Sequence, residues 1–233
     1  MKRFWEIDAL RGFAVLLMLV FNYYFTLRFL DVYTVNAGWE YWWLFPRIIA
    51  GMFIFLVGAS LAISYGRKRN YKHFLKRGAW IFSLGMLATL ATWLYIGQGF
   101  IVFGILHLIG LSIIMALIFF RFNKWNLIIG LIIFIFGFYI NSLHSENYWL
   151  LWLGFIPSDF YSIDYFPILP WFGLLLIGFA VGNSLYSKSK RMFKINDFSE
   201  KMPIKQLTFL GRHSLLIYVV HQPMLIGIVM LIT

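Results

Sequence analysis

The chain has no cysteine, little proline and little charge, and each shortage excludes a class of protein. Without cysteine, disulfides, thiolate metal sites and a covalent acyl-cysteine intermediate are impossible. Only 6 prolines and no low-complexity tract argue against disordered and fibrous proteins. Charged residues make up 12% of the chain, whereas a soluble domain has roughly 25%. The composition therefore indicates an integral membrane protein.

Several enzyme signatures are also missing. The sequence has no phosphate-binding loop, no nucleophile elbow, no zinc-binding HExxH pair and no paired-carboxylate motif. ATPase, serine hydrolase and zinc protease activities therefore have no support, and we expect no metal.

Long apolar runs, at 61% hydrophobic content, predict transmembrane helices. A bilayer core about 30 Å thick needs about 20 helical residues. Runs such as LIIGLIIFIF do not alternate as the strands of a membrane barrel do. Seven runs approach this length, at residues 7–28, 45–65, 78–96, 100–120, 126–140, 166–186 and 207–233. We expect an all-α integral membrane protein, a bundle of about seven transmembrane helices in a single domain over residues 1–233.

The basic residues predict the orientation of this bundle. With seven spans, every Lys and Arg except Arg28 and Arg47 falls on the side of the N-terminus. The positive-inside effect then gives a cytoplasmic N-terminus and an external C-terminus, and explains the net charge of +11 without nucleic acid. The first run lacks a signal-peptide cleavage site, so we expect it to remain as a span. The localisation expected is a multi-pass protein of a prokaryotic cell membrane.

Polar residues within spans are the main functional signal, because they are costly in lipid. Asp8 and Arg11 lie one helical turn apart near the inner surface, as an ion pair or a site would require. Asn22 suits either an interhelical hydrogen bond or a functional role. Arg47 lies on a stripe with Gly51 and Gly58, and it either snorkels to the outer surface or faces the bundle interior.

Two histidines also lie within spans. His107 is flanked by Gly104 and Gly110, which permit close helix contact, and we place it roughly 10 Å below the outer surface. His221 continues a polar stripe and is followed by Gln222. Each histidine is either a satisfied core group or a functional one. Trp171 lies at the outer start of the sixth span, where an aromatic belt is the simpler interpretation.

The stretch RKRNYKHFLKR at residues 67–77 is strongly basic and begins with Arg67, Lys68 and Arg69. It suffices as a determinant of orientation. It would also attract a polyanion such as a coenzyme phosphate, or anionic lipid headgroups.

Five blocks carry a family resemblance: EIDALRGFAVLLMLVFNYYF, FPRIIAGMFIFLVGASLAISY, FGILHLIGLS, LPWFGLLLIGFAVG and FLGRHSLLIYVVHQP. In this order they resemble the small prokaryotic relatives of heparan-α-glucosaminide N-acetyltransferase, in the transmembrane acyltransferase superfamily. The resemblance implies transfer of an acyl group, usually acetyl, from cytosolic acyl-CoA to an acceptor across the membrane.

The resemblance also implies roles for individual residues. Asn22 matches a functional asparagine of the lysosomal enzyme, and His221 matches the histidine of the family's last span. That enzyme's catalytic histidine precedes its second span, but residues 23–45 here contain none. Because the small relatives carry FGILH, His107 is the replacement candidate.

Together these observations predict an acetyl-CoA-dependent N- or O-acetyltransferase acting on an amine or hydroxyl of a sugar or glycan at the outer side. A histidine supplies a base near neutral pH, and Asn or Arg can stabilise an oxyanion. His107 would be the base, with Asn22 and His221 assisting. Substrate contacts are expected from Arg47, Gln222 and Trp171, and coenzyme contacts from Arg11, Arg67, Lys68, Arg69 and Arg212.

The expected partners are membrane lipid, acyl-CoA and a sugar or glycan acceptor, with a homodimer as a further candidate and no nucleic acid. The alternative function is a non-enzymatic transporter or flippase for an anionic metabolite or lipid-linked sugar. A structural scaffold is a third interpretation, but it leaves Arg47, His107 and His221 unexplained.

Overall fold

The computed structural model describes residues 3–33, 38, 40–187 and 190–232. These residues form α-helices that are joined by short helical turns and irregular segments. The chain divides into two compact units. Unit 1 comprises residues 1–56 and 195–233, and unit 2 comprises residues 57–194. Unit 1 therefore joins segments from both ends of the sequence, whereas unit 2 is continuous.

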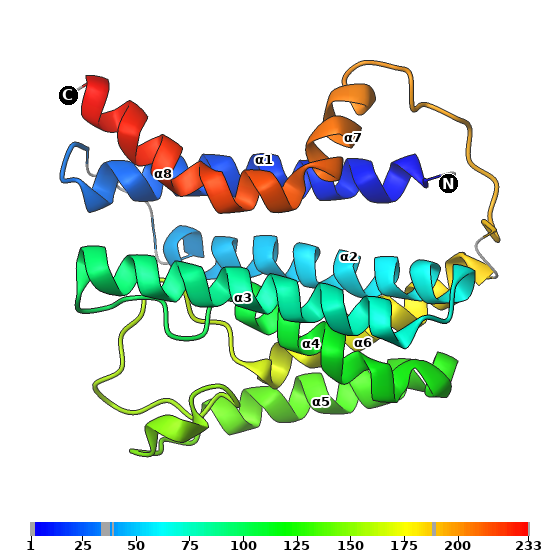
Figure 1. Ribbon diagram of the computed structural model, residues 1–233, viewed down its shortest axis with the longest axis horizontal. Coiled ribbons are helices and arrows are strands. Elements are labelled where there is room, and N and C mark those ends of the chain that lie inside the picture. Colours follow the sequence, from blue (N-terminus) through cyan, green and yellow to red (C-terminus); the bar gives the residue numbers. More distant parts are fainter. Residues whose placement is uncertain (1–2, 34–37, 39, 188–189, 233) are drawn as a thin grey trace. The chain divides into compact units, whose positions relative to one another are not determined.

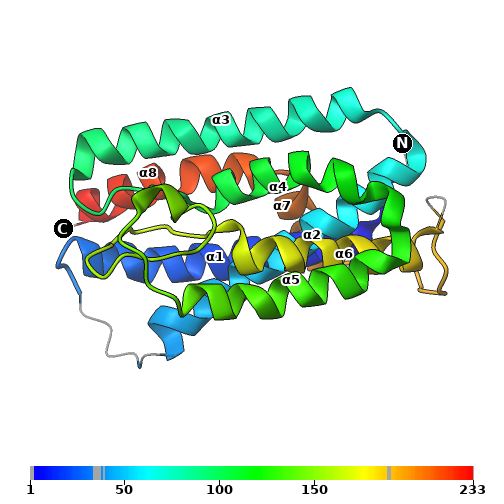
Figure 2. The ribbon, with the colours of Figure 1, turned by 90° about the horizontal axis from the view of Figure 1, so that it is seen from below.

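Unit 1 is built on the first helix, α1 (Trp5–Phe29). A short helix, α7 (Ile204–Arg212), and the last helix, α8 (Ser214–Ile232), both pack against α1. The π-helical turn η1 (Glu40–Leu44) and the beginning of α2 (Phe45–Arg67) complete the unit. Figures 1 and 2 show α8 running alongside α1 in the same direction.

Glycine allows α1 and α7 to approach each other closely. A Cβ at Gly12 would collide with the backbone of Leu207, and one at Gly211 would collide with the backbone of Asp8. Close backbone contact through small residues is typical of helix pairs in membranes, where van der Waals packing drives association. This contact fixes the start of α1 against α7.

Unit 2 contains the end of α2 and four further α-helices, namely α3 (Tyr71–Ile96), α4 (Ile105–Phe119), α5 (Asn126–Asn141) and α6 (Ile168–Leu185). Helix α3 packs on α4, and α5 packs on α6. Two 3₁₀ turns, η2 (Phe120–Trp125) and η3 (Tyr148–Leu150), lie in the connections. The four helices lie roughly along one common axis and alternate in chain direction (Figures 1 and 2).

The two ends of unit 2 have different chemistry. At one end the rings of Tyr65, Phe74 and Phe179 surround Phe120, with centroids 4.5 to 5.3 Å away. The basic segments before α3 and after α4 lie at this end. At the other end the segments 97–104 and 142–167 are joined by hydrogen bonds such as Phe166 N–H to Phe103 O, 2.8 Å. These two segments contain no Lys or Arg.

The described residues include six helical stretches that are long and apolar enough to cross a membrane. These stretches are Trp5–Phe29, Glu40–Arg67, Tyr71–Ile96, Ile105–Asn141, Ile168–Leu185 and Ser214–Ile232. Large apolar side chains such as Trp80, Leu94 and Leu231 are more than half exposed, as expected of side chains that face lipid. The helices and their composition agree with a multi-pass membrane protein.

The count of six differs from the predicted seven because Ile105–Asn141 counts as a single helical stretch of 37 residues. It contains α4 and α5, each shorter than a full span, and the helical path breaks between them at Asn123, where φ is +46°. Seven crossings, with their orientation, stay a prediction.

Three predicted boundaries are corrected by the structure. The fourth run begins its helix at residue 105 rather than 100, because Gly97 and Gly99 adopt positive φ and the chain is irregular to residue 104. Helix α3 begins at Tyr71 rather than 78, with the Asn70 side chain accepting the His73 N–H at 3.2 Å as an N-cap. The last run breaks at His213 into α7 and α8. Residue 233 lies outside the described residues.

Candidate functional site

His107 is the third residue of α4, and its side chain caps the N-terminus of that helix. Its Nδ1 accepts a hydrogen bond from the backbone N–H of Gly104 at 3.2 Å, which satisfies one of the unpaired donors of the first turn. A nitrogen that accepts a bond carries no proton, so in the neutral ring Nε2 carries it and faces Thr89 Oγ1 at 3.3 Å. Both ring nitrogens are therefore engaged.

The ring of His107 is also tightly enclosed. It is 2% exposed and lies against Phe82 and Phe103, with centroids 5.3 and 5.5 Å away. A Cβ at Gly85 of α3 would stand 3.0 Å from the ring. The predicted helix-contact face is thus confirmed, although the partner glycine comes from α3.

The segment 142–167 supports the same helix start from a distant part of the sequence. Asp164 Oδ2 accepts the N–H of Ile105 at 3.2 Å, and a carboxylate here also interacts favourably with the helix dipole. Tyr165 donates its hydroxyl to Leu151 O at 2.7 Å, and burial raises the pKa of that hydroxyl. Because Tyr165 stays protonated, its hydroxyl can hold this segment in place.

His221 on α8 has a different arrangement. Its Nδ1 lies 2.6 Å from the carbonyl oxygen of Tyr218, so Nδ1 carries the ring proton and donates a hydrogen bond to that oxygen. The neutral ring then keeps its lone pair on Nε2, which has no hydrogen-bond partner among the described residues. Pro223 has no N–H for the carbonyl of Val219. His221 is buried, and its Nε2 can accept a proton without losing an existing bond.

Beside His221, a chain of hydrogen bonds joins α8 to α1. Gln222 Nε2 donates to Thr26 Oγ1 at 3.2 Å, and Thr26 donates to the carbonyl oxygen of Asn22 at 2.7 Å. The Asn22 amide donates to Met18 O at 2.9 Å. The buried Gln222 Oε1 makes no hydrogen bond within the described part of the chain. Predicted residues Asn22 and Gln222 thus meet through Thr26, which sequence reasoning did not single out.

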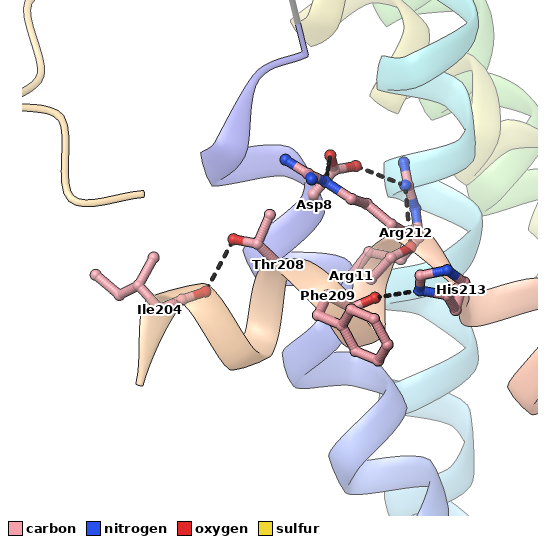
Figure 3. A network of polar contacts seen from close by, with 8 residues as sticks. Asp8, Arg11, Ile204, Thr208, Phe209, Arg212 and His213 are labelled. Carbon is pink, nitrogen blue, oxygen red and sulfur yellow. Dashed lines mark hydrogen bonds and ion pairs between the residues drawn. The ribbon is translucent and has the colours of Figure 1, made fainter. Parts of the chain in front are cut away.

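A cluster of charged side chains lies at the start of α1 (Figure 3). Asp8 Oδ1 accepts a hydrogen bond from Arg11 Nη1 at 3.0 Å, and Asp8 Oδ2 lies 3.5 Å from Arg212 Nε. Arg11 also donates to the carbonyl oxygen of Gly211 at 3.4 Å. The ion pair predicted for Asp8 and Arg11 is confirmed. Arg11 and Arg212, both predicted to contact the coenzyme, converge on this carboxylate.

Arg47 lies at the beginning of α2, where its guanidinium stacks over the Trp43 ring at 4.1 Å and donates to Trp43 O at 2.7 Å. This geometry favours the snorkelling interpretation, in which the cation is held at an aromatic boundary. Trp171, at the start of α6 in unit 2, contacts Phe166, with centroids 5.3 Å apart.

Arg67 ends α2, and Lys68 and Arg69 follow in the exposed connection to α3. The guanidinium of Arg69 lies 5.4 Å from the Tyr65 ring centroid. Along α3 this connection lies well over ten residues from Gly85, hence roughly 20 Å from the His107 contact. The basic segment and His107 therefore belong to opposite ends of unit 2.

Three residues that support the candidate sites escaped sequence reasoning. Thr26 carries a weak signal, one turn after Asn22 on the same helix face. Thr89 and Asp164 carry none, because they reach α4 only through the tertiary fold. The described residues include no cluster of His, Cys, Asp or Glu that could hold a metal ion. The chemistry present is that of histidine, amide and arginine groups.

Residues 3–223 match the family model described as "Heparan-alpha-glucosaminide N-acetyltransferase, catalytic". No curated protein and no solved structure gave a match.

Proposed function

The chain belongs to the heparan-α-glucosaminide N-acetyltransferase catalytic family, and from this premise we propose that it transfers an acetyl group from cytosolic acetyl-CoA to a sugar or glycan at the outer side. The acceptor atom is an amine or hydroxyl. The observation that carries the proposal is the family match, which runs through nearly all of the chain. Acetyl-CoA acts as co-substrate, and the reaction needs no metal.

The charge distribution supports the proposed sides. In unit 2 the basic segments gather at one end, while the acidic residues Glu146, Asp159 and Asp164 lie in the segment at the other. In unit 1, Asp8 near the start of α1 pairs with Arg212, which lies just before α8. Near the end of α1, Thr26 accepts a hydrogen bond from Gln222, which lies farther along α8. Helices α1 and α8 therefore run in the same direction, as an odd number of crossings requires. A cytoplasmic basic end follows from the positive-inside effect.

The donor would be recruited by basic residues of the predicted cytoplasmic side, which each unit supplies separately. Coenzyme A carries several phosphate charges, and arginine presents a planar fork of donors suited to phosphate. Arg11 and Arg212 in unit 1, and Arg67, Lys68 and Arg69 in unit 2, are the groups we assign to this role.

The acceptor's proton would pass to a histidine, and the hydrogen bonds distinguish the two candidates. His107 must give up the hydrogen bond from Gly104 N–H to Nδ1 before it can take a proton, because Nε2 already carries one and faces Thr89. His221 already presents the lone pair of Nε2. We therefore propose His221 as the base and His107 as a positioning residue at the start of α4. This reverses the order expected from sequence.

The remaining groups would serve the acceptor and the oxyanion. Asn22 and Gln222 lie within one hydrogen-bonded chain beside His221, where an amide can donate to a developing oxyanion or to a sugar hydroxyl. Trp171, at the start of α6, is assigned to acceptor contact, whereas Arg47 is held against Trp43 and is assigned to the aromatic boundary instead. With no cysteine in the chain, direct transfer between donor and acceptor is the simplest course, and an acyl-histidine is the covalent alternative.

The proposal is tested with purified protein in proteoliposomes, labelled acetyl-CoA and a panel of amino sugars. The enzyme should acetylate at least one acceptor and release free coenzyme A in equal amount. Since the chain has no cysteine, a thiol reagent reports the released coenzyme without protein background. Movement of an anionic solute or lipid-linked sugar without coenzyme release would instead establish the transporter.

A further inference from the structure

The charged cluster formed by Asp8, Arg11 and Arg212 is unbalanced. One carboxylate faces two guanidinium groups, so the cluster keeps one net positive charge. Asp8 is only 5% exposed. Burying a charge is costly unless it is paired, so Asp8 depends on its arginine partners.

The two arginines are held with different strength. Arg11 donates to Asp8 Oδ1 at 3.0 Å and to Gly211 O at 3.4 Å, and its side chain is mostly buried. Arg212 approaches Asp8 Oδ2 only to 3.5 Å, and that buried oxygen makes no hydrogen bond among the described residues. The Arg212 side chain is 48% exposed. Arg212 is thus the arginine that can exchange its contact with Asp8 for a contact with another anion.

We infer that Asp8 occupies the position beside Arg212 that a phosphate ester of the coenzyme takes on binding. Without coenzyme, Asp8 pairs with the Arg212 guanidinium. When the coenzyme binds, its phosphate replaces Asp8 as the partner of that guanidinium. The inference rests on the proposed function, because that function makes acyl-CoA the donor. Arg212 has five N–H donors and reaches Asp8 through one of them, whereas a phosphate offers several strong acceptors in a matching fork. Asp8 therefore competes with the ligand and lowers its affinity.

A purely structural ion pair gives opposite expectations. If the cluster only fixes α1 to α7, loss of either charge lowers the unfolding temperature and leaves coenzyme affinity unchanged. If Asp8 competes with phosphate, Asp8→Asn strengthens coenzyme binding and at the same time lowers the unfolding temperature of the protein without coenzyme. The two interpretations therefore separate on affinity rather than on stability.

The experiment measures coenzyme A binding to the full chain in phosphatidylcholine nanodiscs, without acceptor and without turnover. Asp8→Asn should lower the Kd about fivefold, the upper range for a partly exposed ion pair. Arg212→Gln should raise it by a similar factor and flatten its dependence on salt. In the double variant the gain from Asp8→Asn should disappear, because the two changes act on one interaction. Pantetheine, which lacks phosphate, should show no difference between variants.

Glu200→Gln is the matched control. Glu200 pairs with Lys205 at 3.0 Å on an exposed part of the same unit, so the substitution makes the same charge change. Its Kd should equal that of the wild type, and an equal gain there would reduce the effect to net charge and overturn the inference. Arg212→Gln, on a half-exposed side chain, provides the decisive measurement if Asp8→Asn fails to fold. An unchanged Kd in that variant also overturns it.

Two further outcomes identify the ligand. If added phosphatidylglycerol stabilises Asp8→Asn more than wild type while coenzyme affinity is unchanged, the phosphate is a lipid headgroup and the coenzyme assignment is wrong. If the wild type binds no coenzyme A and releases none from acetyl-CoA, the proposed function itself fails. If the wild type does both but the variants match it, only the role of Asp8 fails.

Discussion

Replacing each histidine by alanine should separate catalysis from structure. His107 makes two hydrogen bonds and two ring contacts, whereas His221 bonds through Nδ1 to the Tyr218 carbonyl and makes one ring contact, to Tyr218. Within a membrane protein a hydrogen bond contributes about 0.6 to 1.7 kcal/mol, and an aromatic pair adds about 0.5 to 1.5 kcal/mol. His107→Ala should therefore cost roughly 2 to 6 kcal/mol and His221→Ala roughly half of that.

The rates should show the opposite order. If His221 is the base, His221→Ala should lower kcat by roughly 10²- to 10⁴-fold in protein that still folds and binds coenzyme A. His107→Ala should lose thermal stability first, with a smaller loss of kcat in the folded fraction. His107→Asn is the matched variant, because its side-chain oxygen can still accept the N–H of Gly104 and should recover part of the stability.

Both quantities are measured on the same preparations, by thermal unfolding in nanodiscs and by thiol detection of released coenzyme A. Near-normal turnover by His221→Ala would refute the assignment of the base. So would a stable His107→Ala protein with no turnover, since that result would return catalysis to His107 and show that its hydrogen bond from Gly104 N–H is given up during the reaction.

Three other predictions follow from orientation, charge and packing. Reporter fusions after Arg69 and Ser145 should lie on opposite sides of the membrane, and reporters on the same side would contradict the seven-span orientation. Changing residues 67–69 to glutamine should raise KM for acetyl-CoA with little change in kcat, as loss of uniform binding does; an unchanged KM would leave the segment as a determinant of orientation alone. Gly12→Ala should lower the unfolding free energy by about 1 to 3 kcal/mol through overpacking against α7. Gly227→Ala, with no atom within 4 Å of the new Cβ, should not destabilise the protein, and equal effects in the two variants would contradict the close α1–α7 contact.

The sequence predicted the helices well because apolar runs are long and directly visible. Helix α1 begins and ends within two residues of the predicted run at 7–28. Periodic hydrophobicity could not locate the breaks, however. Helix α4 starts late because Gly97 and Gly99 turn the chain, and the last run is interrupted at His213, a residue that carries no helix-breaking signal.

The candidate sites were predictable only in part, for a similar reason. Polar residues in apolar runs identified Asn22, His107 and His221, because such residues are conspicuous in a membrane segment. Arg212 was predicted as one of the basic residues that attract the coenzyme. What each one contacts depends on the tertiary fold. That Gly104 occupies Nδ1 of His107, or that Arg212 reaches back to Asp8, involves hydrogen-bond geometry and contacts between distant segments, which residue spacing does not encode.

The composition of unit 1 from both ends of the chain has a consequence for the order in which the protein assembles during synthesis. Arg11 and Gly211, which share a hydrogen bond, are 200 residues apart in sequence, and the whole of unit 2 lies between them. At about 5 to 20 residues per second, translation takes on the order of 10 to 40 seconds to cover that distance. During this interval α1 is already made, but α7 and α8 are not. Unit 2 can assemble while α1 waits, and ribosome stalling before residue 204 would leave Asp8 with Arg11 but without Arg212.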